Sequence, residues 1–153
     1  MVEPPKPKTA GRKRVKKVPK LSDDNVDNEI FSELDDLKEK VELSIQNFKF
    51  REAMSYVIDV ARLGNKYLTD TEPWKIFNEN PERVKDIIHN SVQIVANISI
   101  LCEPFIPFTS KKIKELLNIT DINWSNVSSS IVNAGHEISG KAHIFSKIED
   151  QAI

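Results

Sequence analysis

The chain has 153 residues, which is enough for one domain with a sizeable apolar core. Its single cysteine, Cys102, excludes an internal disulfide and a cysteine-based zinc site, and it suits a reducing cytosol. No apolar run approaches the roughly 18 residues that span a membrane, and no apolar segment follows the basic first residues as in a secretory signal. We therefore expect a cytoplasmic protein without a membrane as partner.

The net charge of −1 hides two unlike parts of the chain. Residues 1–20 hold eight Lys or Arg residues against Glu3 alone, a charge of +7, which leaves −8 for the remainder. Prolines and a shortage of apolar side chains predict that this basic arm is disordered or extended. Two interpretations stand: the arm is a solvated tail, or it contacts RNA phosphates without sequence preference through Arg12, Lys13, Arg14, Lys16 and Lys17.

The first predicted helix begins near Ser22, a hydroxyl cap that is followed by Asp23 and Asp24 in the first turn. Apolar residues then recur every three or four positions, which indicates one buried stripe of a helix that ends near Asn47. The stripe consists of Ile30, Leu34, Leu37, Val41, Ile45 and Phe48.

A second helix is predicted from about Phe48 to the polar turn 69–71. Gly64 lies inside it at a cost of about 1 kcal/mol relative to alanine. A residue this small makes sense if another backbone passes close by. The side chains predicted to point inward are Phe50, Met54, Val57, Ile58, Ala61 and Leu68.

The next feature is a corner at Pro73 and Trp74. Proline suits the first position of a new helix, so Trp74 should lie beside a helix end. It either closes the core there or offers a flat face to a partner, and periodicity alone favours the core. The second interpretation draws on the neighbours Arg62, Asn65 and Lys66, because aromatic faces beside basic and amide groups suit RNA bases.

Asn80 and Pro81 should cap and open a third helix. This helix is predicted to be central and the most buried, because it carries Val84, Ile87, Ile88, Ser91, Val92, Ile94, Val95, Ile98, Leu101 and Cys102. Glu103 and Pro104 end it. A fourth helix is predicted over 111–118, capped by Thr109 or Ser110, with Ile113, Leu116 and Leu117 inward.

Residues 119–150 have weaker patterning and predict an irregular segment that packs back on the helices, with at most a short strand or hairpin. The sequence therefore predicts an all-α fold: an antiparallel bundle of about four main helices within 21–118, the return segment 119–150, and the arm 1–20.

The sequence shows no arrangement for catalysis. No glycine-rich phosphate loop is present, and His89, His136 and His143 lack the spacing of metal ligands. We expect His89 on the surface or in a capping role, and Cys102 as a small buried apolar residue. No nucleophile, base and oxyanion hole come together, so we predict a binding domain without catalytic residues, metal or cofactor.

Four segments resemble the C-terminal helical bundle of methionyl-tRNA synthetase: NFKFREA (47–53), ARLGNKY (61–67), EPWK (72–75) and LCEPFIPFTS (101–110). Similar segments recur in the class I synthetases for isoleucine, leucine and valine. Two further segments, AGHEI (134–138) and FSKIED (145–150), favour the methionyl enzyme. The resemblance covers roughly residues 21–150.

The resemblance implies that the chain binds the anticodon of a methionine tRNA. In this family the Trp of the Pro-Trp pair stacks on the exposed anticodon, which implies the same role for Trp74, with Pro73 fixing its position. Asn65 matches a family position near the anticodon end of the bundle. Arg62 and Lys66 lie beside it in the sequence and complete the candidate tRNA-binding set.

The chain departs from the family in two ways. It holds no HIGH-like or KMSKS-like motif, so ATP would bind a catalytic domain outside this chain, which should have no ligase activity by itself. Nor do residues 1–20 show the family's first helix, with its Asn and Arg four residues apart. We predict the anticodon-binding portion of a methionine–tRNA ligase. The alternative is a helical protein-interaction module, or a stand-alone, non-specific RNA-binding bundle.

Overall fold

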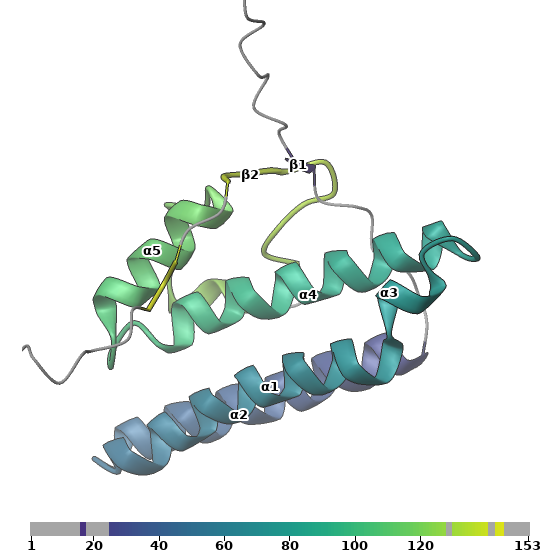
Figure 1. The fold of residues 1–153 in the computed structure, drawn as a ribbon. Coiled ribbons are helices and arrows are strands. Elements are labelled where there is room, and N and C mark those ends of the chain that lie inside the picture. Colours follow the sequence, from purple (N-terminus) through teal and green to yellow (C-terminus); the bar gives the residue numbers. More distant parts are fainter. Residues whose placement is uncertain (1–15, 18–24, 128–129, 141–142, 146–153) are drawn as a thin grey trace, which may run out of the picture.

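The computed structural model describes residues 16–17, 25–127, 130–140 and 143–145 (Figure 1). Several sequence-based predictions lie outside what the structure describes: the side chains of Arg12, Lys13, Arg14, Lys16 and Lys17, the helix start near Ser22, the domain boundary at residues 20–21, and the segment 146–150.

Five α-helices make up most of the described chain: α1 (Asn25–Gln46), α2 (Phe50–Thr71), α3 (Pro73–Ile76), α4 (Pro81–Leu101) and α5 (Pro107–Leu117). Figure 1 shows α1 and α2 side by side as a hairpin, α4 along this pair, and α5 on the far side of α4. The single turn α3 lies in the connection from α2 to α4. The predicted all-α bundle of four main helices is confirmed.

Two apolar clusters form the core. The larger one lies between α1, α2 and α4, and the smaller one joins α4 to α5 and to the return segment, where Ile119 and Val132 are buried. Because α4 contributes to both clusters, the prediction that it is the central helix is confirmed. Asn80 caps α4 as predicted, since its side chain accepts a hydrogen bond from the Arg83 N–H at 3.1 Å.

The predicted stripe of α1 is buried through Ile30, Leu34, Leu37 and Val41. The helix ends at Gln46, and Phe48 turns the chain with a left-handed backbone, φ 58°. The prediction that Phe48 lies inward is wrong, because this turn carries its side chain beyond the end of α1, where it is 81% exposed.

The inward face of α2 also differs from the prediction. The buried residues recur every three or four positions and are Ala53, Val57, Val60, Leu63 and Tyr67. Ile58 lies beside this stripe and is exposed, and Phe50 is exposed because it opens the helix at the end of the bundle. A Cβ on Gly64 would lie 3.2 Å from Ile94 Cγ2, so the close neighbour is a side chain of α4 and not a backbone.

On α4, the prediction of a surface or capping His89 is wrong. The side chain is 4% exposed, and its Nε2 lies 3.0 Å from Nε2 of Gln93, one turn later. Gln93 in turn holds the return segment, because its amide group accepts from the N–H and donates to the carbonyl of Val132. Ile88 and Val95 lie on the face of α4 that points away from these buried residues, and both are exposed.

Helix α5 begins at Pro107, earlier than predicted, and Ile106 occupies the cap position without a side-chain hydrogen bond. The predicted capping by Thr109 or Ser110 is wrong. Ser110 lies inside the helix and is buried, and its hydroxyl donates to the Ser99 carbonyl of α4 at 2.6 Å. The inward positions Ile113 and Leu117 are confirmed.

The return segment is mostly irregular, as predicted. It contains a short 3-10 helix, Trp124–Asn126, and the strand β2 (Glu137–Ile138), which pairs antiparallel with β1 (Lys16–Lys17). The backbone N–H of Ser139 donates to the Leu116 carbonyl at 2.8 Å and so holds β2 against α5. The two described residues of the basic arm are therefore extended and lie at the α5 side of the bundle.

Candidate nucleic-acid interface

The connection between α2 and α4 forms a tight corner. The last residue of α2, Thr71, donates its hydroxyl hydrogen bond to the Tyr67 carbonyl at 2.6 Å. Glu72 then adopts a left-handed conformation, φ 40°, and its N–H donates to the Leu68 carbonyl at 3.1 Å. Pro73 opens α3 at the position that a proline suits. One residue, Glu72, therefore separates α2 from α3, and local hydrogen bonds hold the turn.

Trp74 is displayed at this corner. Pro73 is buried beneath it and Ile76 is half-buried, whereas Trp74 is 62% exposed and Phe77 is 61% exposed. Two anchored residues of the single turn thus hold two aromatic side chains in solvent. This exposure contradicts the interpretation of Trp74 as a core residue.

The cations beside the corner are held loosely. Arg62 donates to Asp59 at 2.6 Å and Lys75 pairs with Glu72 at 2.8 Å, and all four side chains are more than a third exposed. Exposed ion pairs of this kind contribute about 0–1 kcal/mol, so an incoming phosphate can replace the carboxylate. The corner therefore offers cations without a large energetic penalty for freeing them.

Asn65 and Lys66 are also exposed, and they lie on α2 about two helical turns before its end. Lys66 lines a small hollow of about 110 Å³ between α1 and α2, together with the acidic residues Glu29, Glu33 and Asp70. Because acids surround this cation, the surface is poorly suited to a dense row of phosphates. An aromatic face with an amide and a few cations is better matched to unpaired bases.

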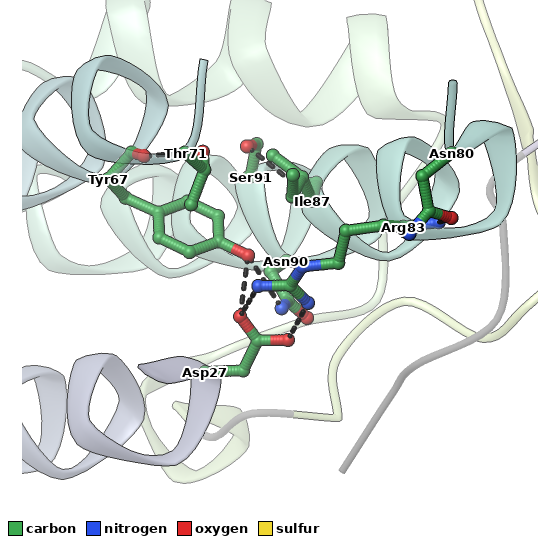
Figure 2. Close-up of polar contacts among 8 residues, drawn as sticks. All are labelled: Asp27, Tyr67, Thr71, Asn80, Arg83, Ile87, Asn90 and Ser91. Atoms are coloured by element: carbon green, nitrogen blue, oxygen red, sulfur yellow. Dashed lines mark hydrogen bonds and ion pairs between the residues drawn. The ribbon is translucent and has the colours of Figure 1, made fainter. Parts of the chain in front are cut away.

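Figure 2 shows a polar cluster formed by Asp27 of α1, Tyr67 of α2, and Arg83 and Asn90 of α4. The Arg83 guanidinium donates two hydrogen bonds to the Asp27 carboxylate, from Nη1 to Oδ2 at 2.7 Å and from Nη2 to Oδ1 at 3.0 Å. The Tyr67 hydroxyl donates to Asp27 Oδ1 at 2.7 Å and accepts from Asn90 Nδ2 at 3.0 Å. Three helices thus meet in one hydrogen-bonded group.

The cluster is deeply buried. Asp27 and Tyr67 are each 1% exposed, and the Arg83 side chain is 17% exposed. Burial raises the pKa of the Tyr67 hydroxyl far above its ordinary value, so the hydroxyl stays protonated and remains a donor to Asp27. Tyr67 is therefore unavailable to a ligand, although it lies next to Lys66 in the sequence.

The matching family model is the anticodon binding domain of methionyl tRNA ligase, and it covers residues 18–153. The chain belongs to this family. Among curated relatives of this anticodon-binding domain, the methionine–tRNA ligase of Cytophaga hutchinsonii is 47% identical over 128 residues, and that of Bacteroides fragilis is 41% identical over 128 residues. Each match covers 83% of this chain.

The chain spans about a fifth of the length of these relatives, 19% in both cases. Methionyl-tRNA synthetase of Mycobacterium tuberculosis, in its apo form, has the same fold over 87% of this chain and 28% of its own length, with a TM-score of 0.76. The sequence identity there is 18%, so this likeness concerns the fold of the anticodon-binding domain alone.

Sequence reasoning missed the buried cluster of this anticodon-binding domain. Its hydrogen bonds join residues 23 to 56 positions apart, and such contacts leave no local pattern. One signal was available: Asp27 lies three positions before Ile30, on the same stripe as the apolar residues of α1. A carboxylate on an apolar stripe indicates a buried partner.

Between residues 25 and 145, apart from the gaps given above, no group of three or more His, Cys, Asp or Glu side chains could hold a metal ion. None of the helices in the described part of the domain is long and apolar enough to cross a membrane.

Proposed function

We propose that this domain binds the anticodon of a methionine tRNA at the α3 corner, with the Trp74 ring stacked on an exposed base. The observation that carries the proposal is the 62% exposure of Trp74 on a buried Pro73, in a chain that belongs to a family of anticodon-binding domains. An exposed aromatic ring on a fixed turn is what a splayed-out base requires.

Stacking of one base on an aromatic side chain contributes about 1–3 kcal/mol. Pro73 fixes its own backbone angle and is buried, so the turn loses little freedom when a base arrives. The ring therefore retains most of the stacking energy as affinity.

Asn65, Arg62 and Lys66 have complementary roles in this proposal. The Asn65 amide offers both donors and an acceptor to a base edge, and the two cations balance phosphates of the same strand. All three are exposed on α2, and Arg62 lies on the order of 13 Å along the helix from Thr71 at 1.5 Å per residue. This distance suits a strand of a few nucleotides that runs along α2 from Trp74.

The basic arm supplies phosphate contacts outside the anticodon. We assign this role to Arg12, Lys13, Arg14, Lys16 and Lys17, on the basis of their charge. Pairing of β1 with β2 supports the assignment, because it attaches the arm to the bundle near α5.

The remaining properties of the ligase belong to parts outside this chain. Since the chain spans about a fifth of its curated relatives, we assign ATP, methionine and the ligation reaction to a catalytic domain, and we expect no ligase activity from this chain alone. We place the protein in the cytoplasm, where tRNA is aminoacylated for translation.

The test measures binding of a fluorescent anticodon stem-loop of methionine tRNA by anisotropy. Trp74→Ala should weaken binding about ten-fold or more, the value of one stacked base. Phe108→Ala is the matched control, because Phe108 is 83% exposed on α5 and should leave affinity unchanged. Equal binding by Trp74→Ala and the parent would refute the stacking role.

The same titration separates the alternatives. A stem-loop with an unrelated anticodon should bind more weakly than the methionine one, and equal affinities would instead indicate a non-specific RNA-binding bundle. If neither RNA binds the full chain in low salt, the helical protein-interaction module is the better account.

A further inference from the structure

We propose that the buried polar cluster of Asp27, Tyr67, Arg83 and Asn90 positions α3, so that these residues set the affinity for RNA without touching it. The inference rests on the proposed function of Trp74. The four residues act through the corner and are therefore positioning residues.

Members of the cluster lie on both sides of α3 in the sequence. Tyr67 lies in the last turns of α2, and Arg83 lies in the first turn of α4, so α3 is the connection between two members of the cluster. Asp27 binds both of them and fixes the separation of the two ends of the connection (Figure 2).

Hydrogen bonds connect the cluster to α3 from both sides. On one side, the Tyr67 carbonyl accepts from Thr71, the residue before the left-handed Glu72. On the other side, the Asn80 side chain accepts from the Arg83 N–H, and the Asn80 N–H donates to the Ile76 carbonyl of α3 at 2.8 Å. A shift of Tyr67 or Arg83 therefore moves the frame that carries Trp74.

The chemistry of the cluster favours a fixed geometry. A two-armed Arg–carboxylate pair fixes angle as well as distance, whereas apolar side chains of similar volume can slide. The cluster also tolerates a deficit, since Asn90 Oδ1 is buried and has no hydrogen-bond partner among the described residues. An unsatisfied acceptor costs stability, so the arrangement is better explained by the geometry it imposes than by stability.

The first measurement tests positioning without RNA. In a Trp124→Phe background, Trp74 is the remaining tryptophan, and its emission and acrylamide quenching report its surroundings. Tyr67→Phe keeps the ring but removes the hydroxyl that joins Asp27 to Asn90, and it should change both signals. Tyr56→Phe is the matched control, because Tyr56 lies on the same helix and its hydroxyl makes no hydrogen bond among the described residues. Its signals should match those of the background.

The second measurement is a double-mutant cycle with the anticodon stem-loop of methionine tRNA. Tyr67→Phe should weaken binding about three- to ten-fold, the worth of one hydrogen bond, when Trp74 is present. It should have no further effect in the Trp74→Ala variant, because residues that act as one unit are not additive. Asn90→Leu removes the other partner of the hydroxyl and should behave in the same way. Circular dichroism confirms that each variant is folded at the temperature used.

The outcomes are distinguishable. Equal loss of binding in both backgrounds, or parental binding by the folded Tyr67→Phe and Asn90→Leu variants, overturns the inference and leaves the stacking role standing. If Trp74→Ala itself binds as the parent does, the proposed function fails, and the emission of Trp74 alone decides whether the cluster positions the ring.

Discussion

The two ends of the bundle both expose aromatic side chains, yet they are built differently. At the corner end, Trp74 and Phe77 are displayed above the buried cluster of Asp27, Tyr67, Arg83 and Asn90. At the hairpin end, where α1 meets α2 and Pro104 lies nearby, the exposed residues are Leu43, Phe48 and Phe50. The interior there is mainly apolar and contains Val41, Leu101 and Cys102.

This difference shows that exposure alone does not identify a binding surface. A ring that must meet a base in one orientation needs a support that resists sliding, and directional hydrogen bonds supply it. The ring centroids of Phe48 and Phe50 lie 6.3 Å apart, edge to face, and among the described residues no buried ion pair supports the turn that carries them. This difference supports the proposal that the corner end is the RNA-binding surface.

The largest effect is expected from a substitution that breaks the ion pair between Arg83 and Asp27 at the corner end. Arg83→Met leaves the Asp27 carboxylate buried without its partner, which should lower the free energy of unfolding by about 3–5 kcal/mol. Lys114→Met is the matched change at the hairpin end. Lys114 itself is 12% exposed, but its partner Glu103, 2.9 Å away, is 53% exposed, so the carboxylate that the substitution leaves behind is in water and the loss should be about 1 kcal/mol or less. Urea denaturation of both variants tests this, and equal losses would contradict the difference between the ends.

A second prediction concerns pH, because burial raises the pKa of one side chain at each end, Tyr67 at the corner end and Cys102 at the hairpin end. Burial raises the pKa of the Cys102 thiol to about 11, and it raises the pKa of Tyr67 further. The unfolded thiol ionises near its ordinary value of 9.0, so stability from Cys102 is complete below pH 9 and is lost as pH rises through 11. The loss should be about 2–3 kcal/mol.

The measurement is urea denaturation between pH 8 and pH 11 for the parent and for Cys102→Ser, which does not ionise. The variant should lose less stability over this range. Parallel curves would show that the hairpin end does not contribute to the alkaline loss.

A smaller effect is expected at the left-handed turn of the hairpin end. Phe48 adopts φ 58°, which costs a side chain other than glycine about 1–2 kcal/mol. Phe48→Gly should therefore raise the free energy of unfolding by about 1 kcal/mol. This value allows for the greater conformational freedom that glycine gives the unfolded chain. Asn118→Gly is the control, because Asn118 has φ 56° but tolerates this conformation, and it should gain less. RNA affinity should stay unchanged in both.

The smallest effect concerns the surface of α2. Arg62→Gln should change stability by less than about 0.5 kcal/mol, because its pair with Asp59 is exposed. It should also lower the slope of log affinity against log salt concentration by about 1, if Arg62 contacts a phosphate. Lys111→Gln on α5 is the control and should leave the slope unchanged; an equal change there would indicate general attraction of charge.

Much of the fold could be predicted from local pattern. The spacing of Ile30, Leu34, Leu37 and Val41 located the buried face of α1, and the Asn80-Pro81 pair located the start of α4. These features depend on neighbours within a few positions. The corner at Pro73 was predicted for the same reason, because proline at the start of a helix is a local signal.

Other features could not be predicted, because their causes lie far away in the sequence. His89 is buried on the face of α4 where Gln93 receives Val132, 39 positions later. Ser110 does not cap α5, because its hydroxyl is used by the Ser99 carbonyl on another helix. Periodicity alone favoured a buried Trp74, and only the family resemblance, which implies a stacking role, pointed to the exposed side chain that the structure has.

The contact between Gln93 and Val132 has a consequence for the order of folding. The side-chain amide of Gln93 takes the place of a neighbouring strand for one residue, since it hydrogen-bonds both the N–H and the carbonyl of Val132. We therefore expect the return segment to dock after α4 has formed and presents this amide. We also expect the docked segment to detach while the helices stay intact, and exchange of the Val132 amide proton with solvent would record that opening separately from global unfolding.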